Sequence, residues 1–158
     1  MGLILIVLFA CLFGYLGPAF AEGEPFMGIS LSPDSVSFRA DASPGIYDSQ
    51  PVDVMVRSEN KDWTIQCEAI SPLSHSDGKN QIPSKRLYLN SPFTKADVDN
   101  GAGPGFESME IPRLAARGSF TAPMSLKVSS LRFRLLTTWE DKPGTYAGHI
   151  RFTYITNP

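Results

Sequence analysis

Apolar and polar residues alternate with a period of two along most of this chain, and this alternation limits the fold more than any other feature. In residues 52–57 it puts Val52, Val54 and Val56 on one face. Residues 63–69 repeat it, with Trp63, Ile65, Cys67 and Ala69 on one face. Successive side chains of a strand point to opposite faces of a sheet, so such runs predict strands with one buried face.

The chain between these runs is rich in turn residues. Thirteen glycines and thirteen prolines leave little room for long helices. About seven to nine short strands follow, and one-sided, turn-linked strands favour antiparallel sheets. Two sheets packed face to face would bury the apolar faces that a single sheet leaves in water. We therefore expect an all-β fold, an antiparallel β-sandwich over residues 28–158, with a closed barrel as the alternative.

Several finer expectations concern pairing and phase. Residues 52–57 and 63–69 flank a polar turn and should form a hairpin. The alternation changes phase within 126–135, and a bulge or strand break at Ser129-Ser130 would restore it. We expect residues 71–84 and 91–105 to be loops, and residues 112–118 could hold a helical turn.

The parity of the strands also predicts the core. The large aromatic residues at core positions are Trp63, Phe133, Trp139, Phe152 and Tyr154. Tyr146 follows a Pro-Gly turn, and we expect its hydroxyl to anchor that corner, as in a tyrosine corner.

The first 21 residues have the layout of a secretory signal peptide. They carry no charged side chain, residues 3–13 are almost purely apolar, and Ala19-Phe20-Ala21 offers small residues for cleavage. An apolar run of about eleven residues is short for a bilayer span of about twenty. We expect cleavage after Ala21 and an N-terminal linker over 22–27. An uncleaved anchor and a lipoprotein signal at Cys11 are the alternatives.

Charge excludes some partners. Fourteen Lys and Arg against sixteen Asp and Glu give a net charge of −2, too balanced for a nucleic-acid surface. We expect contact with a membrane only through the signal segment before its cleavage. Cleavage would leave Cys67 as the one cysteine, so no intrachain disulfide could form.

Three stretches carry a resemblance to bacterial extracytoplasmic immunoglobulin-like domains. They are residues 31–38 (LSPDSVSF), the valine strand with Asp62-Trp63-Thr64-Ile65, and residues 143–148 (PGTYAG). The first two are similar to the opening of BACON-type domains, and the third resembles the end of pilin-like surface domains. The resemblance implies an immunoglobulin-like sandwich and an adhesive or structural role in the cell envelope. Sugar binding is a further role that the resemblance allows, and it assigns no residues to it.

Catalytic and metal-binding patterns are weak. Cys67 has core parity and should be buried and unreactive, and His75 and His149 read as surface residues. Asp97, Asp99 and Glu107 are the best calcium candidates, but their spacing does not follow an EF-hand loop, and we expect a solvated acidic turn there. The sequence has no Gly-x-Ser-x-Gly and no His-Glu-x-x-His. We therefore expect neither an enzyme nor a cofactor.

The sequence favours a non-catalytic secreted or cell-envelope protein with a structural, adhesive or filament-subunit role. The first and last strands are expected to be sheet edges, which could pair with a protein partner or with a second copy. The alternative is a carbohydrate-binding module that uses aromatic rings beside the two long loops, namely Tyr88, Phe93 and Phe106.

Overall fold

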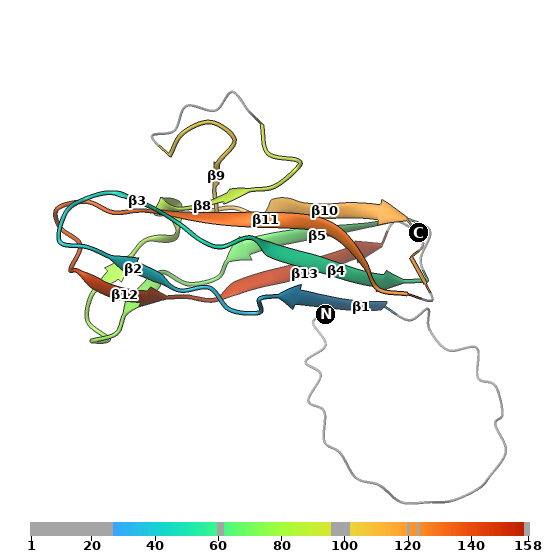
Figure 1. Ribbon diagram of the computed structural model, residues 1–158, viewed down its shortest axis with the longest axis horizontal. Helices are drawn as coiled ribbons and strands as arrows, with labels where there is room; N and C mark the ends of the chain where they lie inside the picture. Colours follow the sequence, from blue (N-terminus) through green and yellow to red (C-terminus); the bar gives the residue numbers. More distant parts are fainter. Residues whose placement is uncertain (1–26, 60–61, 96–101, 120, 123, 157–158) are drawn as a thin grey trace, which may run out of the picture.

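The computed structural model describes residues 27–59, 62–95, 102–119, 121–122 and 124–156 (Figure 1). Apart from one 3-10 turn, η1 (Ser84–Arg86), every regular element among them is a strand. The strands are β1 (Met27–Ser32), β2 (Phe38–Ala40), β3 (Ile46–Asp48), β4 (Val52–Ser58), β5 (Asp62–Ala69), β6 (Leu73–His75), β7 (Gln81–Ile82), β8 (Leu87–Asn90), β9 (Glu107–Ser108), β10 (Arg113–Ser119), β11 (Leu126–Leu136), β12 (Gly144–Ala147) and β13 (Ile150–Thr156). The predicted all-β class is confirmed. The predicted signal peptide (1–21) and all of the linker except Met27 lie outside the described residues.

The strands form three antiparallel sheets. The largest has the order β1-β4-β11-β8-β9, with β3 also paired to β11. The second has the order β10-β5-β13, and the third, at the other end of the molecule, has the order β2-β12-β6-β7 (Figure 1). In the figure β4 and β11 lie in front of β5 and β13, which makes a two-layered sandwich.

One core fills the space between the layers. Val54 of β4, Ile65 of β5 and Leu131 of β11 are all fully buried and belong to a single cluster. Each fully buried aliphatic side chain stabilises the fold by about 1.5–3 kcal/mol relative to exposure. The faces predicted by alternation in β4, in β5 and in residues 131–135 of β11 are therefore confirmed, whereas Leu126 at the start of β11 is 46% exposed.

The predicted hairpin of residues 52–57 and 63–69 is wrong. β4 pairs with β1 and β11, whereas β5 pairs with β10 and β13. The two strands lie in different sheets, and their apolar faces meet across the core. Alternation fixes which face of a strand is buried, but it does not say which strand lies beside it.

Three segments depart from the expected elements. Residues 71–84 are not only a loop, because β6 and β7 pair as a short hairpin within them. Residues 113–119 form strand β10 and not a helical turn. The phase change in β11 is a register shift between Lys127 and Ser129 within one continuous strand, which confirms the predicted bulge one residue earlier.

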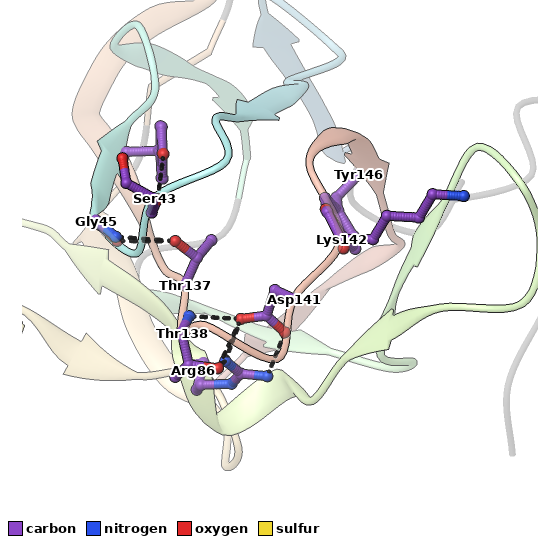
Figure 2. A network of polar contacts seen from close by, with 9 residues as sticks. Ser43, Gly45, Arg86, Thr137, Thr138, Asp141, Lys142 and Tyr146 are labelled. Atoms are coloured by element: carbon purple, nitrogen blue, oxygen red, sulfur yellow. Dashed lines mark hydrogen bonds and ion pairs between the residues drawn. The ribbon is translucent and has the colours of Figure 1, made fainter.

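The connection between β11 and β12 is shown in Figure 2. Tyr146 is fully buried and its hydroxyl donates to the Lys142 carbonyl at 2.7 Å, which confirms the predicted corner. Trp139 departs from its predicted core position, since it is 80% exposed. β11 ends at Leu136, so the alternation that placed Trp139 inward no longer applies three residues later.

Candidate functional site

The first and last strands are sheet edges, as expected. β1 ends the largest sheet, β13 ends the second sheet, and the two lie close together along one side of the molecule (Figure 1). At the opposite side β10 of one layer lies against β11 of the other. The sandwich is therefore closed along the β10/β11 side, and its two layers end in edge strands along the β1/β13 side.

An apolar cleft of about 370 Å³ enters the molecule on the β1/β13 side. One lip is formed by β1 and the segment that follows it, including Leu31 and Val36. The other lip is formed by the start of β13, including Ile150 and Phe152. The floor is the core itself, with Phe133 among its residues, so the cleft gives a ligand direct access to buried apolar surface.

Partly exposed hydrophobic residues gather at this cleft. Nine such residues pack against the main core of the described chain, and six of them come from β1, the segment after it and β13, four of which line the cleft. We call these six residues the seam: Ile29, Leu31, Val36, Ile150, Phe152 and Tyr154. Because most of the partly buried residues that pack against the core lie there, the seam is a part of the described core that another molecule could cover with gain of apolar burial.

The edges of the sandwich differ in how they are protected against pairing. The edge strand β10 carries Arg113 and Arg117, and its register along β5 shifts between Leu114 and Ala116. The edge strands β9 and β7 are only two residues long. β1 has six residues, none of them charged, and a regular register along β4. Charges, bulges and short length are the usual means by which an edge strand avoids pairing with another chain, and β1 has none of these.

β13 is similarly open to pairing. It has seven residues in regular register with β5, and its one charged residue is Arg151. The Arg151 guanidinium is paired with the Glu68 carboxylate of β5, so the local charge is balanced. The two edges at the seam are thus the long, regular and weakly charged edges of the sandwich.

The predicted aromatic binding surface is corrected for two of its three residues. Tyr88 and Phe106 are only 6% and 8% exposed, and together with Ala102 they form a small second cluster. The Arg134 guanidinium lies over the Phe106 ring, 3.8 Å from its centre. Phe93 is half-buried beneath Arg117, 5.2 Å from the ring centre. Segment 102–106 folds back over β8, which covers rings that the sequence places beside a loop.

The calcium hypothesis gains no support from its one described residue. Asp97 and Asp99 lie outside the described residues. Glu107 accepts a hydrogen bond from the Lys95 backbone at 3.3 Å and faces Arg113 at 3.4 Å, so its charge is already balanced. Within the described ranges, no group of three or more His, Cys, Asp or Glu residues could hold a metal ion.

The two histidines differ in environment. His149 is exposed at the rim of the cleft, as expected. His75 is only 7% exposed, so its predicted surface position is wrong. Its Nε2 lies 3.1 Å from the Pro143 carbonyl, and its Nδ1 accepts from the Asp77 backbone N–H at 3.1 Å. The pairing of β6 with β12 explains this burial, because it brings His75 against the 142–144 turn.

Cys67 is buried, as expected. Burial raises the pKa of its thiol to about 12, with a smaller contribution from the Glu68 charge. At neutral pH the thiol is therefore protonated, and the thiolate that a nucleophile or metal ligand needs is not formed.

Comparisons with family models, with curated proteins and with solved structures give no match to this chain. Over the described parts of the chain, no helix has the length and apolar character that crossing a membrane requires.

Proposed function

We propose that this chain is a non-catalytic secreted or cell-envelope protein with a structural or adhesive role, and that it binds by taking up an extended strand of another polypeptide at the seam. The observation that carries the proposal is the apolar cleft between two long, weakly charged edge strands. A strand added there would pair with an edge backbone and place alternate side chains in the cleft.

The energetics favour a strand over a small molecule. Each backbone hydrogen bond gained at an edge contributes about 0.5–1.5 kcal/mol net. Apolar side chains that enter the cleft contribute about 25 cal/mol for each Å² of apolar surface removed from water. Charged ligands are disfavoured, because the lining is mainly apolar and the only charged or imidazole side chains among its described residues, Asp34 and His149, are exposed.

The predicted export fits this role. A cleavable segment at residues 1–21 would deliver the chain outside the cytoplasm, where structural and adhesive proteins meet their partners. Cys67, buried and protonated, would resist oxidation in an oxidising compartment outside the cytoplasm. The role as a filament subunit is one version of the proposal, since strand uptake between copies can continue head to tail.

The test uses a capped, uncharged peptide of about eight residues with alternating valine and threonine, within the usual length of a strand. We expect that adding it to isotope-labelled protein shifts the backbone amide resonances of β1 and β13 and leaves those of β10 unchanged. The control is the same peptide with proline at two central positions, which cannot pair along an edge. Absence of shifts, or shifts centred on another edge, would overturn the proposal.

A further inference from the structure

We infer that the strand taken up at the seam is β13 of a second copy, paired antiparallel about a two-fold axis at Thr153. This inference rests on the proposed function and names its partner. The dimer would contain one continuous sheet of order β10-β5-β13-β13-β5-β10, with the largest sheet of each copy packed on the same side.

β13 is better suited to self-pairing than β1. Its sequence, IRFTYIT, consists almost entirely of β-branched and aromatic residues, which favour strands. β1 contains Gly28, Ser30 and Ser32, which offer little side-chain surface across a strand pair. β13 also exposes Ile155, a large hydrophobic residue on its outer face that is 38% exposed. A partner strand would cover this side chain.

The register of the two β13 strands follows from the need to keep the two Arg151 side chains apart. A two-fold axis at Thr153 places Arg151 opposite Ile155 of the second copy, so the two arginines lie about 13 Å apart along the strand. That separation exceeds the Debye length of about 8 Å at physiological ionic strength. An axis at Phe152 would halve the separation, and an axis at Arg151 would place the two like charges directly opposite each other. Glu68 balances each arginine further.

An axis at Thr153 also pairs the remaining side chains of β13 with favourable partners. Phe152 lies opposite Tyr154 of the second copy, and this occurs twice by symmetry. Aromatic pairs and Thr–Thr pairs are among the favourable cross-strand neighbours, and Thr153 lies opposite itself. On the inner face, the half-buried Phe152 and Tyr154 of both copies would form one apolar row. On the outer face, Ile155 would lie against the aliphatic stem of Arg151.

The test is the oligomeric state of the purified protein, measured by sedimentation velocity and light scattering over a range of concentrations. We expect a monomer–dimer equilibrium. Thr153→Lys should raise the dimer dissociation constant about tenfold or more, because it places two like charges opposite each other on an exposed face. The matched control is Thr145→Lys, an exposed strand threonine on β12, which should leave the equilibrium unchanged.

Charge complementation separates a broken interface from a damaged fold. Thr153→Glu alone should also be monomeric, but mixing it with Thr153→Lys should restore a dimer, since opposite charges then face each other. Failure of the mixture to associate, or dimers of Thr153→Lys as stable as those of the unaltered protein, would overturn the inference. An unaltered protein that stays monomeric while the valine–threonine peptide still shifts β1 and β13 would overturn the two-fold dimer and leave strand uptake standing.

Discussion

Gly144 is the residue at which backbone conformation and side-chain packing meet. Its φ of +145° is one that L side chains rarely adopt. A Cβ atom built there would lie 2.2 Å from Nε2 of His75. The buried imidazole is held by the Pro143 carbonyl and the Asp77 backbone, so it cannot move away without losing these hydrogen bonds. The corner before β12 thus depends on the absence of a side chain.

Gly144→Ala should lower the free energy of unfolding by about 2–4 kcal/mol, since backbone strain and overpacking add. The control is Gly78→Ala, which has a φ of +72° but no atom within 4 Å of the added Cβ. It should cost only the backbone strain of about 1–2 kcal/mol. Urea unfolding followed by circular dichroism measures both. Equal losses for the two variants would show that His75 does not resist the added methyl group.

At the scale of elements, the turn between β11 and β12 is held by one carboxylate (Figure 2). Asp141 accepts hydrogen bonds from the Thr138 backbone N–H at 2.6 Å and from Nη2 of Arg86 at 2.8 Å. Burial alone would raise the pKa of Asp141, but the hydrogen bonds from Arg86 and Thr138 outweigh it and lower that pKa. The Asp141 side chain therefore links η1 to the turn and holds the loop that carries the exposed Trp139 in one conformation.

Asp141→Asn should lower the free energy of unfolding by about 1–3 kcal/mol, because Arg86 loses its counter-charge while mostly buried. Glu140→Gln, the same change at the exposed neighbouring residue, should stay within about 0.5 kcal/mol. Thermal unfolding at neutral pH measures the difference. If both variants melted together with the unaltered protein, the ion pair would not stabilise the turn.

At the scale of the molecule, aspartates join segments that are distant in sequence. The hydrogen bond from Arg134 of β11 lowers the pKa of Asp48 in β3, and that from Lys127 lowers the pKa of Asp53 in β4. The backbone N–H of Lys79, followed by the Lys142 ammonium, lowers the pKa of Asp77 well below its usual range. Asp48 and Asp53 each join two strands of the largest sheet, Asp77 joins the β6–β7 turn to the turn before β12, and Asp141 joins that turn to η1. Their contribution to stability requires the charged carboxylate.

Stability should therefore depend on pH in the acidic range. A carboxyl group whose folded pKa is lowered stabilises the fold above its unfolded pKa of about 3.9, and this contribution is lost as the pH falls through the folded value. We expect the free energy of unfolding to be nearly constant from pH 7 to about 5 and to fall progressively below about 4. Urea titrations across this range measure it. Stability that stayed constant to pH 2 would contradict the role of these carboxylates.

Within the longer strands, the sequence by itself determined which side chains face inward. Val52, Val54 and Val56 are buried as their alternation predicts, Cys67 is buried, and Tyr146 anchors its corner. These properties are local: a strand has a period of two, and a Pro-Gly turn positions the residue that follows it. The bulge in β11 was also visible, because a change of phase must be absorbed within the strand that contains it.

Only the tertiary structure decided which strands pair and where the sandwich stays open. β4 and β5 are consecutive yet lie in different sheets, Tyr88 and Phe106 are covered, and Trp139 is exposed. The seam arises because the edges β1 and β13, more than a hundred residues apart, end their sheets on the same side. Alternation is equally satisfied by any partner that covers the apolar face, so contacts between distant segments make the choice.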